Sequence, residues 1–204
     1  MFAKDFRQRA WQSLSGNWGI AILAYFLVGI VNGVAASATV GVGSWLIAGI
    51  VGVGYASFSL SLGRRENTQI EQLLDGTKDL GNNFMAGLLV SLYTFLWTLL
   101  FIVPGVIKAL SYSMTYYILR DNPGMLASEA IKRSEETMMG HKWQLFCIYL
   151  SFIGWILLSF LTCGILMFMV VPYMMQTSAE FYRYLNAERD FYQQNPSDQY
   201  SEQI

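Results

Sequence analysis

Apolar residues form three long runs along this chain, separated by short polar connectors. The runs cover residues 19–62, 84–119 and 143–179. The first and third contain no Asp, Glu, Lys, Arg or His, and the second contains one such residue, Lys108. A helix of roughly 36 residues would be about 54 Å long, whereas the hydrocarbon core of a bilayer is about 30 Å thick. Each run is therefore too long for one crossing and about right for two.

Glycine and proline interrupt each run near its midpoint. The interruptions are Gly41-Val-Gly43, Pro104-Gly105 and Thr162-Cys-Gly164. These residue types permit a tight reversal and end a continuing helix. The sequence therefore predicts an all-α fold, a polytopic transmembrane helical bundle of six helices arranged as three hairpins.

Basic residues lie almost entirely outside the runs. Of the 13 Lys and Arg residues, all except Lys108 lie in the amino-terminal segment, the two connectors or the tail. The hairpin turns carry no charged residue. By the positive-inside rule, both termini and both connectors face the cytoplasm. This predicts a multi-pass protein of the plasma membrane, with membrane lipids as its surroundings.

Composition supports this assignment and argues against several functions. The chain is 54% hydrophobic and only 13% charged, against about 25% charged for a soluble domain. A net charge of −1 gives no reason to expect nucleic acid as a partner. Cys147 and Cys163 lie in apolar runs without metal-binding spacing, and His141 has no evident partner for a metal or for catalysis. No cofactor is expected.

Similar motifs recur before and after each hairpin. The segments SGNWGIAIL, LGNNFMAGLL and MGHKWQLFCI each place Gly, polar residues and an aromatic before the apolar run. This predicts three repeat-like units, residues 1–65, 66–121 and 122–187, in a single membrane domain covering residues 1–187. Residues 188–204 are predicted to form a flexible cytoplasmic tail. The alternative for the first run is a signal peptide cleaved after Ala36-Ser-Ala38.

Each unit begins with a short amphipathic segment. Phe2, Phe6, Ala10 and Leu14 recur every four residues in the first. In the second, residues 68–71 form a capping-box pattern, Ile70, Leu73 and Leu74 share a face, and Gly76 is a plausible stop. In the third, Leu126, Ala130, Ser134 and Met138 line one side. Such helices pad the cytoplasmic face of a bundle, and docking of a protein partner is the alternative.

Small residues repeat every four positions in the first hairpin. They are Gly29, Gly33 and Ser37 on the first helix and Ser44, Ala48, Gly52 and Ala56 on the second. This spacing lets helix backbones approach closely. Packing within the chain is the expected use, and a homo-oligomer is the alternative.

Three blocks resemble a bacterial integral-membrane family catalogued as domain of unknown function 975. They are GNWG at Gly16, PGVIKALSYSMTYYILRDNP at Pro104 and GHKWQLFCIYLSFIGWILL at Gly140. The resemblance implies a polytopic protein of the bacterial plasma membrane with no established reaction. It supplies no functional residues.

Lys108 is the main candidate for a functional residue, because an ionisable residue inside a membrane span is costly. The apolar runs contain no Asp or Glu to pair with it. Its ammonium is expected either to reach the outer headgroups along its flexible stem or to occupy a site inside the bundle. The candidate functional or interfacial residues are Lys108, Pro104, Gly105, Tyr112, His141 and Trp143.

Three classes of function fit this pattern unequally. The first is a non-enzymatic membrane protein that acts by association with partners, of an accessory, envelope-stress or immunity type. The second is a small permease or lipid-handling protein, for which Ser and Thr hydroxyls would line a polar path. The third is a membrane enzyme using His141, Glu135 and Glu136, which lack a nucleophile–base arrangement. We expect the first class and no enzymatic activity.

Overall fold

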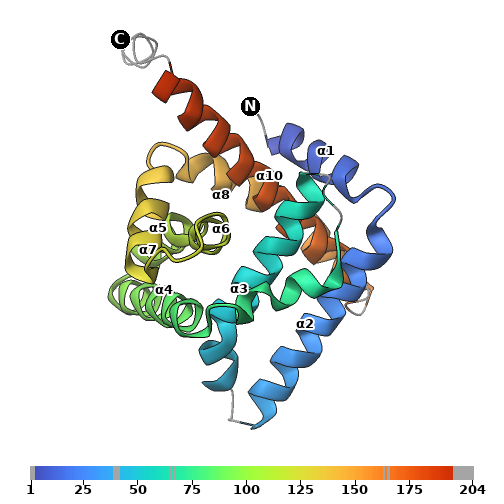
Figure 1. Ribbon diagram of the computed structural model, residues 1–204. Helices are drawn as coiled ribbons and strands as arrows, with labels where there is room; N and C mark the ends of the chain where they lie inside the picture. Colours follow the sequence, from blue (N-terminus) through green and yellow to red (C-terminus); the bar gives the residue numbers. More distant parts are fainter. Residues whose placement is uncertain are drawn as a thin grey trace.

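The computed structural model describes residues 3–38, 42–64, 66, 68–162, 164 and 166–194. Helices make up most of these ranges, and they contain no β-strand (Figure 1). This confirms the all-α fold class predicted from the sequence. The helices follow one another through the three predicted units, although the repeat itself stays a prediction.

The first unit is a short helix followed by a long hairpin. Its elements are α1 (Ala3–Leu14), α2 (Trp18–Ala38) and α3 (Val42–Gly63). Phe6, Ala10 and Leu14 are buried, which confirms the amphipathic pattern of α1, while Phe2 lies outside the described residues. The chain bends by 97° between α1 and α2, at a turn where Gly16 has φ +90°, a conformation that favours glycine. Of the predicted first turn, Gly41-Val-Gly43, Gly41 lies outside the described residues, whereas Val42 and Gly43 are the first residues of α3.

The second unit reverses direction earlier than the sequence predicts. Its elements are η1 (Ile70–Thr77, a 3₁₀ helix), α4 (Leu80–Leu100), α5 (Ile102–Tyr112) and α6 (Thr115–Asp121). The reversal occurs at Phe101, whose backbone is extended, and not at Pro104-Gly105. Pro104 instead lies in the first turn of α5, where a missing N–H costs no helical hydrogen bond. At η1, the hydroxyl of Thr68, the expected capping residue, donates to the carbonyl of Glu66 at 3.2 Å, and the helix begins after Gln69, which makes no side-chain cap.

The third unit contains a helix run broken at its middle. Its elements are α7 (Ala127–Thr137), α8 (Lys142–Leu150), α9 (Ile153–Leu161) and α10 (Met167–Gln194). The predicted face of α7 is buried at Ala130, Ser134 and Met138, but Leu126 is exposed. Gly164 has a positive φ at the predicted third turn, while Cys163 lies outside the described residues. The polar tail begins as helix, because α10 continues to Gln194.

The main hydrophobic core lies where α3, α6, α8 and α10 meet. It includes the buried side chains of Leu60, Met114, Ile118, Leu145 and Phe181. α1 packs along the middle of α10 (Figure 1), where Tyr173 donates to the carbonyl of Arg7 at 3.0 Å and the rings of Phe6 and Phe181 meet edge-on with centroids 5.2 Å apart. The first and last helices of the chain therefore close the bundle together.

Glycines bring the backbone of α3 into direct contact with α4 and η1. A Cβ atom added at Gly49 would lie 1.9 Å from the carbonyl oxygen of Asn83, and one at Gly87 would lie 2.3 Å from the nitrogen of Gly49. A Cβ atom at Gly54 would lie 2.0 Å from the carbonyl oxygen of Leu73. No other residue type fits such a close approach, so these glycines fix how the first two units pack.

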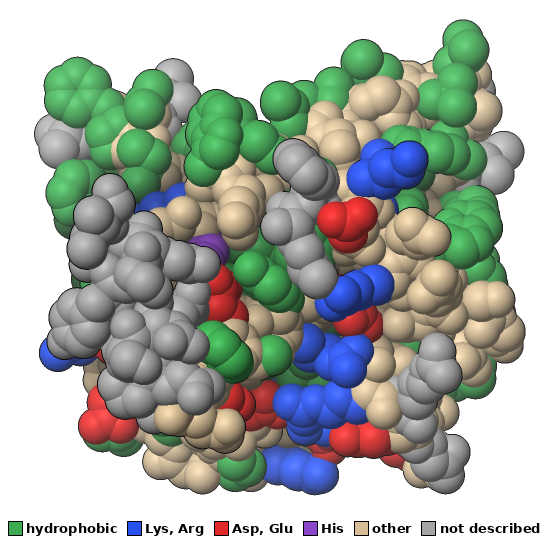
Figure 2. Space-filling model, turned by 90° about the horizontal axis from the view of Figure 1, so that it is seen from above, with side chains coloured by type: hydrophobic (Ala, Val, Ile, Leu, Met, Phe, Trp, Pro, Cys, Tyr) green, Lys and Arg blue, Asp and Glu red, His purple; other side chains and the backbone are tan. Residues whose placement is uncertain are grey.

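Large hydrophobic side chains are exposed at the hairpin ends. Val34 is 63% exposed, Leu99 73%, Phe101 68% and Leu161 81%. In Figure 2, hydrophobic side chains line the upper edge of the molecule, while most Lys, Arg, Asp and Glu side chains gather in the centre and below. On the face that Figure 2 shows, an apolar edge therefore adjoins a charged area; these are called the apolar end and the charged end below.

Length and apolar composition support fewer crossings than the six that the sequence predicts. Among the described residues, one helical run, Lys142–Ser159, is long and apolar enough to cross a membrane. α1 and α2 add a second crossing if the bent pair is taken as one span. This is weak support for a membrane location, and the six-helix transmembrane bundle stays a prediction.

Candidate functional site at the charged end

Asp121, the last residue of α6, joins three helices at the charged end. Its carboxylate accepts a hydrogen bond from Arg64, after the end of α3, at 2.7 Å, and from the hydroxyl of Tyr182 in α10 at 3.2 Å. Arg120 adds a third contact at 3.2 Å. The hydrogen bond to Asp121 raises the pKa of Arg64, and burial raises the pKa of Tyr182 to about 12. The cluster is therefore held together by a fixed guanidinium–carboxylate pair.

Asp75 ties η1 to the middle of α3. It accepts hydrogen bonds from the hydroxyl of Ser57 and from Lys78, whose Nζ lies 2.6 Å from Oδ1. Burial acts to raise the pKa of Asp75, but the hydrogen bonds from Lys78 and Ser57 and the nearby cations outweigh it, so the pKa is lowered. The carboxylate is therefore ionised at neutral pH.

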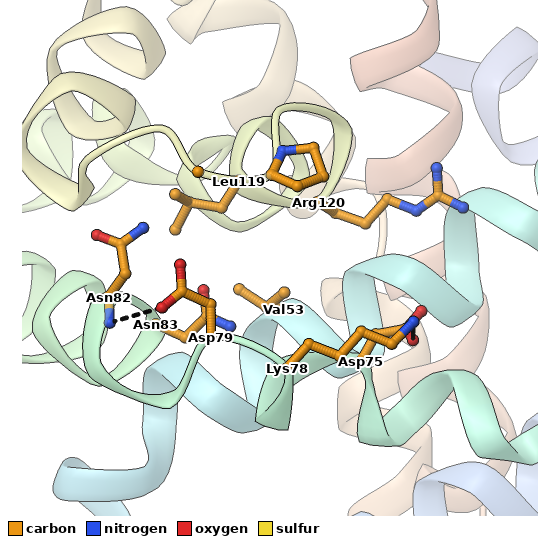
Figure 3. Close-up of a pocket in the computed structure, with 10 residues that line it drawn as sticks. Val53, Asp75, Lys78, Asp79, Asn82, Asn83, Leu119 and Arg120 are labelled. Carbon is orange, nitrogen blue, oxygen red and sulfur yellow. Dashed lines mark hydrogen bonds and ion pairs between the residues drawn. The ribbon is translucent and has the colours of Figure 1, made fainter.

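A cavity of about 280 Å³, with charged and apolar side chains in its wall, lies between η1, the start of α4 and the end of α6 (Figure 3). Its wall carries two carboxylates, Asp75 and Asp79, and two cations, Lys78 and Arg120. In Figure 3, the carboxylate of Asp79 points across the cavity toward Leu119, whereas Lys78 extends to Asp75 and Arg120 extends away. The charges balance, so the wall shows no preference for an anion or a cation.

Asparagines at the start of α4 fix the cavity wall. Asn82 uses both ends of its amide, donating to the carbonyl of Met125 and accepting from the N–H of Ala127 at 2.8 Å. Asn83 donates to the carbonyl of Gly76 at 2.8 Å. Over the described ranges, no group of three His, Cys, Asp or Glu residues is placed to hold a metal ion. The polar groups gathered here bind one another and join helices.

Lys108 has a partner that the sequence analysis did not assign to it. Its ammonium forms an ion pair with Glu135 of α7 and lies over the rings of Trp97 and Tyr112, 5.4 and 5.7 Å from their centroids. The expected reach toward outer headgroups is therefore not what the structure shows. Next to this pair, Ser134 accepts from the N–H of Met114 at 3.2 Å and donates to the carbonyl of Ser111 at 2.7 Å. α7 is thus bound to the break between α5 and α6.

The other candidates lie in separate places. Gly105 packs on α4, since an added Cβ would lie 2.3 Å from the Thr98 hydroxyl oxygen. His141 contacts Gln144 at 3.2 Å and Glu188 at 3.7 Å. Trp143 is exposed and stacks on Phe146. The structure therefore brings Lys108 and Tyr112 together but leaves His141 and Trp143 apart from them.

The small residues proposed for helix packing have varied surroundings. A Cβ atom at Gly29 or Gly33 would meet nothing within 4 Å, while one at Gly52 would lie 2.8 Å from the ring of Tyr116. Ala48 and Ala56 line a cavity between helices. The side chain of Ser44 lies outside the described residues.

The sequence pattern did not indicate several residues of the charged end as candidates for a functional site. Asp75, Asp121 and Asn82 lie in connectors or at helix ends, where polar residues are usually solvated. The close spacing of Asp75 and Lys78 was the available signal for a local ion pair. Nothing local indicates that Asp121 pairs with Arg64, 57 positions earlier.

These features define a class: an all-helical protein with an apolar end formed by hairpins and a charged end tied by ion pairs. Residues 99–189 match the family described as "Protein of unknown function (DUF975)". The match confirms the resemblance for the blocks at Pro104 and Gly140, while the block at Gly16 lies outside it. The matched segment runs from the end of α4 into α10 and includes both Lys108 and Glu135. No curated protein and no solved structure matches the chain.

Proposed function

We propose that this protein is a non-enzymatic, multi-pass protein of the bacterial plasma membrane that acts by association with partners. Its three apolar hairpins enter the bilayer, and its charged end, with both termini, faces the cytoplasm. The observation that carries the proposal is the separation of the exposed hydrophobic hairpin ends from the ion-paired charged end. Exposed apolar surface on this scale marks contact with lipid or another protein.

Helix lengths support insertion of the hairpins. α2, α3 and α4 contain 21, 22 and 21 residues and no Asp, Glu, Lys or Arg. At about 1.5 Å per residue they are about 31–33 Å long, close to the thickness of a hydrocarbon core. These lengths suit insertion of the first two hairpins, whereas α5, with 11 residues, is too short to complete a crossing.

The proposal that the protein is not an enzyme rests on the hydrogen-bond partners of its carboxylates. The carboxylates of Asp75, Asp121 and Glu135 each accept hydrogen bonds from side chains of the same chain. A general base or nucleophile must instead reach a substrate. The ion pairs join helices and leave the charged end as a rigid surface on which a partner can bind.

Cysteine accessibility tests the topology. In a background with Cys147 and Cys163 replaced by Ser, Lys78→Cys and Lys132→Cys should react with a membrane-impermeant maleimide in inverted vesicles and not in intact cells. Both positions are exposed. Labelling of either variant in intact cells would refute the orientation, and release of the protein by carbonate washing would refute membrane insertion.

Association is tested by affinity purification from native membranes. A partner should copurify reproducibly with the wild-type chain and less with Lys132→Glu, which reverses a charge on the exposed face of α7. Leu99→Met at the apolar end is the matched control. Repeated absence of a specific partner would count against association.

A further inference from the structure

A larger cavity, of about 660 Å³, lies where the three units meet. α2 and α3 contribute Tyr25 and Tyr55, the second unit contributes Tyr116, and α8 and α10 contribute Tyr149 and Met174. Cavities of about 300–1,000 Å³ are typical of small-molecule sites. Because it lies between the three units and not within one of them, this cavity is the best candidate for a ligand-binding site in this fold.

The cavity wall suits an apolar ligand. None of its lining residues is charged. The amide of Asn32 donates to the carbonyl of Val28 at 3.0 Å, and the hydroxyls of Tyr149 and Ser178 bind each other at 3.2 Å. These polar atoms already have partners inside the protein, and the remaining wall is apolar apart from the hydroxyls of tyrosines such as Tyr25, Tyr55 and Tyr116.

A space of this size does not stay empty. Apolar cavities of about 150 Å³ remain dry, and the cost of an unfilled cavity rises with its volume. A volume near 660 Å³ is several times larger, and its apolar wall offers water few partners. The cavity therefore favours an apolar occupant.

The cavity opens onto an apolar surface. Gly29 and Met175 line it and are exposed, so they mark its edge. On α2, beside this edge, Phe26 and Ile30 are also exposed. A ligand therefore enters from an apolar phase.

We propose that this cavity binds the alkyl chain of a membrane amphiphile. The inference rests on the proposed membrane location and names the ligand class that the location would supply. The thioethers of Met174 and Met175 adapt to a flexible chain, and the tyrosine rings give it a broad apolar contact. The chain belongs either to a bilayer phospholipid or to a free fatty acid.

Photolabelling in nanodiscs tests the proposal. The probes are phosphatidylglycerol with a diazirine on one acyl chain and, in a second arm, a diazirine fatty acid. Gly29→Phe fills the cavity edge, and Gly33→Phe, one turn away on α2, is the matched control. A Cβ atom meets nothing within 4 Å at either position, but only Gly29 lines the cavity. Ala48→Leu is a second filling variant.

We expect adducts on Tyr25, Tyr149 or Met174 in the wild type. Labelling there should fall about tenfold in Gly29→Phe and Ala48→Leu, as for a site lost to overlap, and stay unchanged in Gly33→Phe. Labelling by either probe supports the proposal and identifies the source of the chain. Adducts confined to outward side chains such as Leu99, or equal labelling in wild type and both filling variants, would overturn it. Recovery of the protein in nanodiscs reports membrane insertion separately.

Discussion

Replacing Gly87 by Ala tests whether the contact between α3 and α4 depends on the absence of a side chain. The added Cβ atom would lie 2.3 Å from the nitrogen and 2.7 Å from the Cα of Gly49. Ordinary van der Waals contact begins at 3.4 Å, so the helices must separate by about 1.1 Å, the difference between 3.4 and 2.3 Å. Both colliding atoms belong to the backbone, so no side-chain rotation relieves the overlap.

The expected loss follows from two opposing effects. Overpacking a tight interface costs about 1–3 kcal/mol, and backbone collisions lie at the upper end of that range. Alanine gains about 1 kcal/mol over glycine in a helix interior. We expect a net destabilisation of about 1–2 kcal/mol, a large share of a total stability of about 5–15 kcal/mol.

Gly81→Ala is the matched control on the same helix. A Cβ atom at Gly81 meets nothing within 4 Å, so this variant should be neutral or up to about 1 kcal/mol more stable. Both variants are compared with the wild type by thermal unfolding in detergent micelles. A Gly87→Ala protein as stable as Gly81→Ala would refute the close approach of α3 and α4.

Three further predictions concern polar contacts. A double-mutant cycle of Lys108→Met and Glu135→Gln should give a coupling energy of about 1 kcal/mol between the two side chains. The value is small because both side chains are partly exposed to solvent. Single effects that simply add would contradict the ion pair. Ser134→Ala should lower the free energy of unfolding by about 1–2 kcal/mol, because it leaves the N–H of Met114 without its acceptor. The control Ser113→Ala should cost less, because the Ser113 hydroxyl donates only to the carbonyl of Leu110 in its own helix. Because the folded-state pKa of Asp75 lies below its usual value of 3.8, its stabilisation is complete above that pH and is lost as the pH falls through the folded-state pKa. Asp75→Asn should therefore lose less stability than the wild type between pH 7 and pH 3, and equal losses would contradict this assignment.

The sequence predicted those features that depend on local pattern. The spacing of Phe6, Ala10 and Leu14 placed the buried face of α1 correctly, because helical periodicity is local. Long apolar runs correctly predicted helices. The reversal at Phe101 was missed because proline breaks a helix interior but is tolerated in a first turn, and composition does not distinguish the two.

Contacts between distant segments were not predictable in the same way. Gly49 and Gly87 belong to different helices, and each could equally well have faced lipid. The partner of Lys108 could not be predicted from the apolar runs, because Glu135 comes from a polar connector that folds back onto α5. Such pairs can be predicted only when the path of α7 across the preceding hairpin is known.

The contact between Lys108 and Glu135 limits how far the α4–α5 hairpin reaches beyond the charged layer. Glu135 shares the short helix α7 with Lys132, Arg133 and Glu136, so α7 lies at an aqueous surface. The part of α5 before Lys108, residues 102–107, extends only about 9 Å, against a hydrocarbon core of about 30 Å.

A hairpin tied to that surface therefore enters the membrane without crossing it, although α4 alone is long enough to cross. We expect Val103→Cys, at the exposed hairpin end, to resist a membrane-impermeant maleimide in both intact cells and inverted vesicles, while Lys132→Cys reacts in inverted vesicles. Labelling of Val103→Cys in intact cells would show a full crossing, and α7 would then have to follow Lys108 into the bilayer together with its charges.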